Sequence, residues 1–138
     1  MSKFSKDLVD FKIKFYSNII KDMASLLTIT AVLFYIEYFS QYLMARFHLV
    51  DSSDTNYVGT GAGAVRQSTG DDVLYYIIKL RNAIVHCDVN NIKEYIALLK
   101  HVDFYEGPYS STDALTIKGY VMLSSVDWDS LENYLLDI

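Results

Sequence analysis

Residues able to act on a phosphodiester are concentrated late in one predicted helix. Arg81, Asn82 and His86 stand close together in the chain. Histidine titrates near neutral pH and can move a proton to or from a reacting oxygen. Arginine stays charged and donates paired hydrogen bonds to phosphate oxygens, which stabilises the charge of a pentacoordinate phosphorus. These residues therefore suit RNA cleavage, with His86 as acid or base, Arg81 on the phosphate and Asn82 orienting either group.

This chemistry is expected to use no metal and no other cofactor, because the ribose 2′-hydroxyl of RNA supplies the nucleophile. The hydroxyl loses a proton as it attacks phosphorus, and the leaving 5′-oxygen gains one, so a 2′,3′-cyclic phosphate remains. One histidine is usually too little for both transfers. We therefore expect a homodimer that brings two copies of His86 and Arg81 into one cleft.

The helix that carries these residues is predicted to begin near Asp71, whose charge suits a helix N-terminus. A turn of about 100° per residue places four apolar residues on one side: Val73, Ile77, Leu80 and Ile84. The opposite side carries four polar residues: Tyr75, Lys79, Asn82 and His86. Tyr75 and Lys79 are candidate substrate-binding residues, although a solvated face explains them equally well. Arg81 lies between the two sides, with a side chain long enough to reach the polar one.

The remaining sequence predicts a mainly α fold, a bundle of four to five helices with one short strand or hairpin near residues 113–124. The first helix is amphipathic, and its apolar stripe is Phe4, Leu8, Phe11, Phe15 and Ile19. A nearly uncharged, central helix follows from Met23 to about Phe47. A later helix runs from about Asn90 to His101, with an apolar face of Ile92, Tyr95, Ile96 and Leu99. The last begins near Asp129, where residues 129–132 (DSLE) fit an acidic capping box.

We expect a single domain over residues 1–138, with a loop at about 48–70 and a C-terminal extension at about 107–138. Residues 51–70 are rich in Ser, Thr, Asp and Gly, which is typical of a loop. The glycines at 59–63 could suggest a phosphate-binding loop. That motif requires a preceding strand and a closing Lys-Ser/Thr, and the sequence has neither, so a linker is the better interpretation.

Composition limits the classes of function. The chain has 138 residues, of which 51% are hydrophobic, which suffices for one packed core. Its net charge of -5 argues against broad, sequence-blind nucleic-acid binding, so any contact with RNA must be local. Cys87 is the only cysteine, so a disulfide framework is excluded and a reducing, cytoplasmic location is expected. Residues 1–10 lack the apolar run of a signal peptide.

One apolar segment could be mistaken for a membrane span. Residues 23–36 carry no charge, and extension to Ala45 adds only Glu37. The uncharged part is shorter than the roughly 20 residues that a bilayer requires. We therefore expect a buried core helix and no membrane contact.

Residues 81–86 (RNAIVH) resemble the signature of the HEPN family, in which an Arg, often followed by a polar residue, precedes a His by a few positions. The resemblance implies a helical bundle, a homodimer with the motif at its interface, and an RNA endonuclease. It also implies a place in toxin–antitoxin or phage-defence systems, with an antitoxin or a larger defence complex as partner. One subgroup carries Tyr two positions after the His. Asp88 stands there instead, which speaks against modification of such a tyrosine by a nucleotidyltransferase partner.

Simpler interpretations compete with catalysis. His86 could cap the end of its helix, with Arg81 paired to Asp88 or to another carboxylate. The protein would then be a non-catalytic helical binding module: a regulatory partner, an antitoxin or a nucleotide sensor. Cys87 points to another side of the helix than His86, so a small core residue is favoured over a nucleophile. The sequence does not name the RNA target, whose candidates are single-stranded RNA and a tRNA loop.

Overall fold

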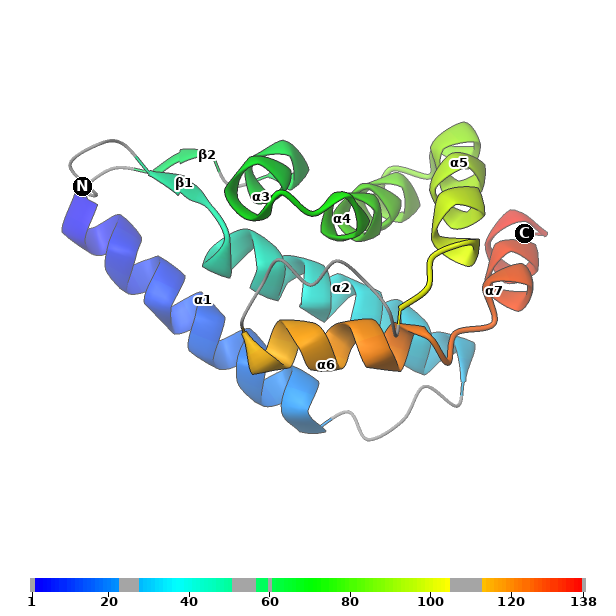
Figure 1. The fold of residues 1–138 in the computed structure, drawn as a ribbon, viewed down its shortest axis with the longest axis horizontal. Helices are drawn as coiled ribbons and strands as arrows, with labels where there is room; N and C mark the ends of the chain where they lie inside the picture. The colour runs from blue at the N-terminus through cyan, green and yellow to red at the C-terminus, as the bar shows by residue number, and fades with distance from the viewer. Residues whose placement is uncertain (1, 23–27, 51–56, 60, 105–112, 138) are drawn as a thin grey trace.

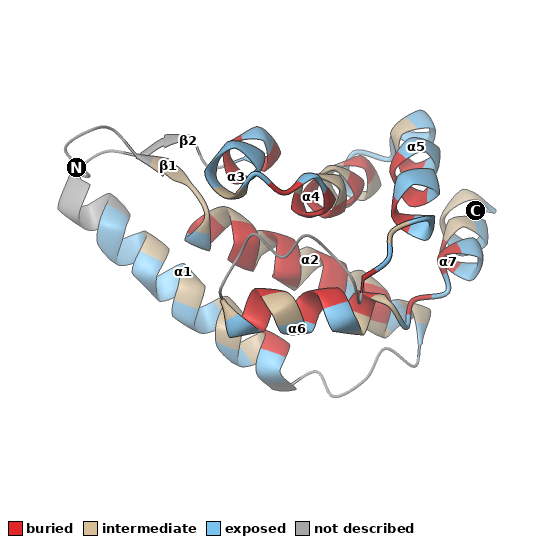
Figure 2. Cartoon of the chain, in the orientation of Figure 1, coloured by how far each residue is buried: buried red, intermediate tan, exposed pale blue. Residues whose placement is uncertain are grey.

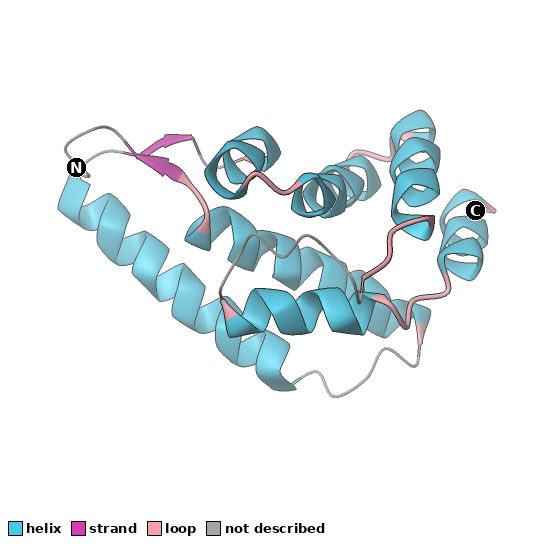
Figure 3. Ribbon diagram, in the orientation of Figure 1, coloured by secondary structure: helices cyan, strands magenta, loops and turns pink. Residues whose placement is uncertain are grey.

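The computed structural model describes residues 2–22, 28–50, 57–59, 61–104 and 113–137. Within these ranges the chain forms seven α-helices and one two-stranded antiparallel sheet (Figures 1 and 3). The prediction of a mainly α fold is confirmed. The expected number of helices was too low, because two segments that were predicted as loop and as strand are helical.

Helices α1 (Ser2–Asp22) and α2 (Ile29–Arg46) lie side by side and run in roughly opposite directions (Figure 1). Thr28 caps α2, where its hydroxyl accepts a hydrogen bond of 3.1 Å from the backbone N–H of Ala31. Both helices were predicted. The expected start at Met23 lies outside the described residues.

The side of α1 that packs differs from the predicted stripe. Ile20 is fully buried, and Ile13 and Tyr16 pack against the core. Phe11 and Phe15, in contrast, are 63% and 48% exposed. The helix has two apolar sides, and periodicity does not say which of them meets α2.

Helix α2 is the centre of the fold, as its apolar sequence predicted. Buried side chains occur along its whole length (Figure 2): Val32, Tyr35, Ile36, Phe39, Ser40, Tyr42, Leu43 and Ala45. Packing from several sides explains why the sequence shows no clear polar face. In the described part of the chain, no helix is both long and apolar enough to cross a bilayer.

The predicted loop at 48–70 contains regular structure. Strands β1 (Leu49–Val50) and β2 (Tyr57–Gly59) pair antiparallel, with Leu49 opposite Gly59. Helix α3 (Ala62–Thr69) follows and ends at Gly70, whose φ of 69° is the left-handed conformation that favours glycine. So short a helix is not stable alone. Burial of Ala62, Ala64 and Val65 stabilises it, and sequence composition did not reveal this tertiary contact.

Helices α4 (Asp72–Val85) and α5 (Val89–Lys100) confirm their predictions to within a residue or two. The predicted apolar face of α5 is buried, from Ile92 to Leu99. Helix α4 crosses α2 steeply, since Figure 1 shows α4 nearly end-on and α2 lengthwise. The two helices are in contact, which brings residues far apart in the sequence together.

The predicted strand or hairpin near 113–124 is wrong, because these residues form helix α6 (Ala114–Leu123). Asp113 caps the helix: its carboxylate accepts from the N–H of Leu115 at 3.2 Å and from the hydroxyl of Thr116 at 2.7 Å. The same carboxylate binds Tyr42, and pairs with Arg46 at 3.2 Å, both on α2. This anchoring outweighs the β propensity of the segment.

Gly119 lets α6 approach α2 closely. A Cβ atom at this position would lie 2.3 Å from the ring of Phe39, closer than any real contact allows. The glycine that suggested a turn is therefore a packing residue inside a helix.

Helix α7 (Trp128–Leu136) begins earlier than predicted. Its cap is Asp127, whose carboxylate accepts from the backbone N–H of Ser130 at 3.1 Å and from its hydroxyl at 2.8 Å. The expected cap, Asp129, lies in the first turn and pairs with Lys100 of α5. The spacing of the side chains is compatible with a helix that begins after Asp127 or after Asp129. The earlier start is the one that lets Trp128 be buried.

Candidate functional site

The N-terminal end of α4 is fixed by a buried carboxylate. Asp71 is only 1% exposed and accepts a hydrogen bond of 2.9 Å from the backbone N–H of Val73. Tyr120 of α6 donates its hydroxyl to the second oxygen of the same carboxylate. A buried carboxyl group that is hydrogen-bonded at both oxygens holds its helix firmly in place. The predicted start of the helix near Asp71 is confirmed, and the structure shows in addition that Asp71 is its N-cap.

The C-terminal end of α4 is a tight turn built around His86. The N–H of Cys87 donates to the carbonyl of Ile84 at 3.2 Å, and that of Asp88 to the carbonyl of Ala83 at 2.9 Å. This pair of bonds is the Schellman arrangement, and Cys87 takes the left-handed position at a φ of 53°. Asp88 then caps α5 through the N–H of Asn91. His86 is therefore held at a helix junction by backbone bonds alone.

The side chain of His86 is exposed. Across the ranges that the structure describes, its ring makes no hydrogen bond and no ion pair. Both ring nitrogens are thus open to solvent or to a ligand. Cys87 is exposed as well, so the expectation of a small core residue at that position is wrong.

Arg81 is directed toward α2 and engages Glu37. Its Nε donates to Oε2 of Glu37 at 2.5 Å, and its Nη2 donates to Oε1 at 3.0 Å. The third nitrogen, Nη1, donates to the side-chain oxygen of Asn82 at 3.1 Å. The two charged side chains remain partly accessible, at 22% and 35% exposure. These contacts fix the plane of the guanidinium. Its remaining N–H groups can donate to a further acceptor.

The ion pair shifts the pKa of both Glu37 and Arg81. The hydrogen bond from Arg81 lowers the pKa of the Glu37 carboxyl below its usual value, against the opposing effect of partial burial. The same bond raises the pKa of Arg81. Gln41 adds a third contact, donating to Glu37 at 3.1 Å. Both groups are therefore charged at neutral pH, and the pair is fully formed.

The predicted motif is only partly assembled within one chain. Arg81 and Asn82 are in contact through their side chains, but the ring of His86 makes no hydrogen bond or ion pair with either in the described residues, and only its backbone N–H donates to the carbonyl of Asn82, at 3.0 Å. Five helical positions correspond to a rotation of about 140° between the two side chains on α4. Arg81, which the sequence placed between the apolar and polar sides of the helix, is directed to α2 because the carboxylate of Glu37 attracts it, and it also contacts Asn82 of the polar side. The competing interpretation, in which Arg81 pairs with a carboxylate, is correct for this residue.

Tyr75 and Lys79 lie together on the outer side of α4. The Lys79 ammonium is 6.0 Å from the centre of the Tyr75 ring, and the Arg66 guanidinium is 4.5 Å from it. Arg66, on α3, also pairs with Asp72 at 2.8 Å. Sequence reasoning missed Arg66 because it stood in a segment predicted to be a loop. The ring of Tyr75 is thus already covered by a cation of the protein itself.

Glu37 is the second residue that sequence reasoning missed. The available signal was that Glu37 is the only charge between residues 23 and 45. A lone carboxylate in a helix that packs on several sides needs a partner of opposite charge. Arginines in the rest of the chain were therefore candidates for that partner.

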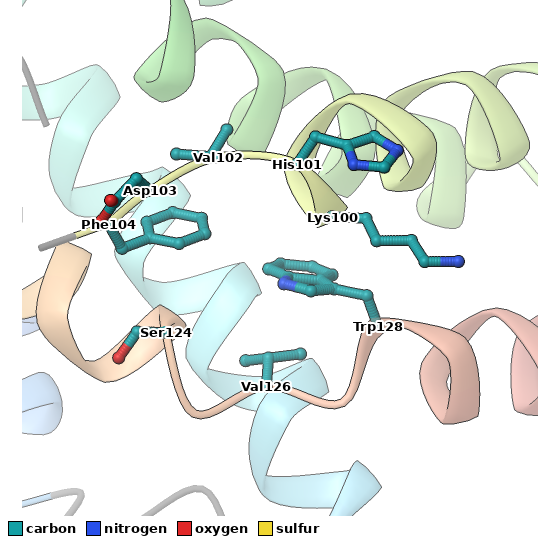
Figure 4. Close-up of a pocket in the computed structure, with 8 residues that line it drawn as sticks. All are labelled: Lys100, His101, Val102, Asp103, Phe104, Ser124, Val126 and Trp128. Atoms are coloured by element: carbon teal, nitrogen blue, oxygen red, sulfur yellow. The ribbon is translucent and has the colours of Figure 1, made fainter. Parts of the chain in front are cut away.

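A cavity with described walls lies elsewhere in the molecule. It has a volume of about 470 Å³ and lies between the end of α5 and the segment that joins α6 to α7 (Figure 4). Its lining residues are Lys100, His101, Val102, Asp103, Phe104, Ser124, Val126 and Trp128. None of the predicted site residues is among them. The rings of Phe104 and Trp128, which are both buried, are stacked in its wall with their centres 6.3 Å apart.

Comparisons with known proteins add no relative. A scan against protein families, a search of curated proteins and a search of solved structures each found no significant match to this chain.

Proposed function

We propose that this chain is a metal-independent endoribonuclease that acts as a homodimer. The observation that carries the proposal is the combination of an exposed histidine at the C-terminal cap of α4, with both ring nitrogens open, and a guanidinium already oriented about 1.4 turns earlier in that helix. His86 is the acid or base, Arg81 binds the phosphate with its remaining N–H groups, and Asn82 holds the guanidinium in position.

The reaction is a transesterification within the RNA. The 2′-oxygen loses its proton to a basic imidazole and bonds to phosphorus, while the 5′-oxygen leaves and takes a proton from an acidic imidazole. The products are a 2′,3′-cyclic phosphate and a free 5′-hydroxyl. Because one exposed His86 cannot be base and acid at once, the second imidazole comes from a second copy of the chain.

Cleavage of a short single-stranded RNA in the presence of a metal chelator tests this proposal. We expect wild-type protein to release fragments ending in a cyclic phosphate, and His86→Ala to lower the rate by about 100-fold or more. His101→Ala is a matched control, because His101 is also an exposed histidine at the end of a helix. A substrate with a 2′-deoxyribose at the cleaved position should resist. Equal rates for wild type and His86→Ala would contradict the proposal.

The second candidate is a non-catalytic binding module, such as an antitoxin or a regulatory partner. The bidentate contact between Arg81 and Glu37 favours it, because the carboxylate cancels the charge that a phosphate would seek. Expression in bacteria distinguishes a nuclease from a non-catalytic binding module. A nuclease toxin should slow growth in a way that His86→Ala relieves and His101→Ala does not, whereas a binding module should leave growth the same for all three proteins.

A further inference from the structure

Apolar side chains, mostly aromatic, form a continuous set on the outer side of α1 and α2; four of them are exposed and the fifth, Tyr38, is half-buried. We call it the aromatic face, and its members are Leu8, Phe11, Phe15, Phe34 and Tyr38. Phe11 and Phe15 are stacked with ring centres 5.9 Å apart, and Phe34 and Tyr38 are stacked at 6.1 Å. Tyr16 joins the two pairs, at 5.3 Å from Phe15 and 6.0 Å from Tyr38.

This face is too exposed to be part of the core. Phe11 is 63% exposed and Phe34 52%, and Leu8 and Phe15 are both above 40%. Single exposed apolar residues are ordinary, but a contiguous group of this kind marks a surface that is covered by something else. Aromatic rings at such a surface lose little conformational freedom on binding and are frequent in protein interfaces.

The charges along the edge of the face identify its occupant. On the side of the stripe away from α2, the exposed charged residues among those described are Asp7 and Asp10 in the first half of α1, and Lys14 and Lys21 in the second half. Acid followed by base along one edge is complementary to itself when two such helices lie antiparallel. A membrane surface would instead favour lysines without the intervening acids.

We infer that the aromatic face binds the same face of a second copy of this chain, with α1 antiparallel to α1. A two-fold axis near Ile13 would place Phe11 of one copy against Phe15 of the other. It would also bring Asp10 and Asp7 to within about one helical turn of Lys14 and Lys21 of the second copy. Each charged pair then occurs twice, as the symmetry of such a dimer requires.

The aromatic face adjoins the Arg81–Glu37 ion pair. Glu37 neighbours Phe34 on the surface of α2, because it follows Phe34 by three positions, which is about one turn of the helix. A copy bound here would border the guanidinium of Arg81, where the proposed reaction needs a second imidazole. This link to catalysis rests on the proposed function, whereas the dimer itself rests only on the face and its charges.

Analytical ultracentrifugation over a micromolar concentration series tests the dimer. We expect wild type to be a dimer, and Phe11→Ser with Phe15→Ser to raise the dissociation constant by about tenfold or more. Val121→Ser is the matched control, because Val121 is an exposed apolar residue on α6, outside the face. Circular dichroism confirms that each variant is folded. A monomeric wild type, or a dimer that the double variant leaves unchanged, would overturn the inference.

A charge exchange tests the antiparallel arrangement. Lys14→Asp and Asp10→Lys should each weaken the homodimer, because each places like charges opposite one another. A mixture of the two variants should form a heterodimer of nearly wild-type affinity, since position 10 of each then faces an opposite charge at position 14 of the other. Failure of the mixture to associate better than either variant alone would rule out this arrangement.

The outcomes distinguish this inference from the proposed function. A dimer that leaves RNA intact supports the interface and contradicts the nuclease. A dimer that cleaves RNA, and that Phe11→Ser with Phe15→Ser leaves associated, supports the nuclease and contradicts this interface. A monomer that binds anionic phospholipid vesicles through Phe11 and Phe15 would replace the second copy by a membrane surface.

Discussion

The two ends of the 81–86 segment depend on the fold in different ways. Arg81 is tied to a second helix by a bidentate ion pair, so its side chain takes part in the packing of α4 on α2. His86 is held only through its backbone, and its ring extends into solvent. A substitution at the first position therefore changes structure and chemistry together. One at the second position changes chemistry alone, which makes His86 the cleaner probe of function.

The largest expected effect concerns stability. Arg81→Ala leaves the Glu37 carboxylate at the α2–α4 contact without its main partner, so we expect the free energy of unfolding to fall by about 2 kcal/mol. A fully buried pair would cost more, but both side chains here are partly solvated. His86→Ala should change the free energy of unfolding by less than about 0.5 kcal/mol. Urea denaturation measures the free energy of unfolding of both variants. If Arg81→Ala and His86→Ala lowered it by similar amounts, the two residues would not differ in their contribution to the fold.

The dependence of the free energy of unfolding on pH tests how much the charge of Glu37 contributes to stability. The folded protein lowers the pKa of this carboxyl. Its charge therefore contributes stability above the pKa of the unfolded state, and this contribution is lost as pH falls through the lower, folded-state pKa.

We expect Glu37→Gln to be less stable than wild type at neutral pH. The difference between their free energies of unfolding should become smaller on acidification below about pH 4. Denaturation curves across this range provide the measurement. Glu94→Gln, at an exposed carboxylate of α5, is the control and should follow wild type throughout. A gap that stays constant in acid would mean that the charge of Glu37 does not stabilise the fold.

The smallest effect is expected in the turn that holds His86. Cys87 adopts a φ of 53°, which costs a residue with a Cβ about 1–2 kcal/mol more than glycine. Cys87→Gly should therefore raise the free energy of unfolding, by about 0.5 kcal/mol after the greater freedom of glycine in the unfolded chain is included. Cys87→Ala keeps the strain and should show no gain. If the alanine variant gained as much as the glycine variant, loss of the thiol and not relief of backbone strain would be the cause.

Sequence reasoning succeeded where local signals agreed. Helix α4 has an acidic residue at its start and an apolar stripe, and the structure confirms its start near Asp71 and the burial of Val73, Ile77 and Leu80. It failed for α3 and α6, whose residues have loop or strand preferences. Those helices form because Val65 and Tyr120 are buried and because Asp113 binds α2, and contacts between distant segments are not visible in a local pattern.

The sequence by itself determined a mainly helical chain, the apolar central helix, and the presence of Arg81, Asn82 and His86 on one helix. Periodicity is sufficient for this, because burial of one side requires a repeat near 3.6 residues. Only the tertiary structure decided that Glu37 holds Arg81, from 44 positions away, and that the phenylalanines of α1 face outward. Both outcomes depend on which side of one helix meets another, and several sides of α1 and α2 were chemically able to do so.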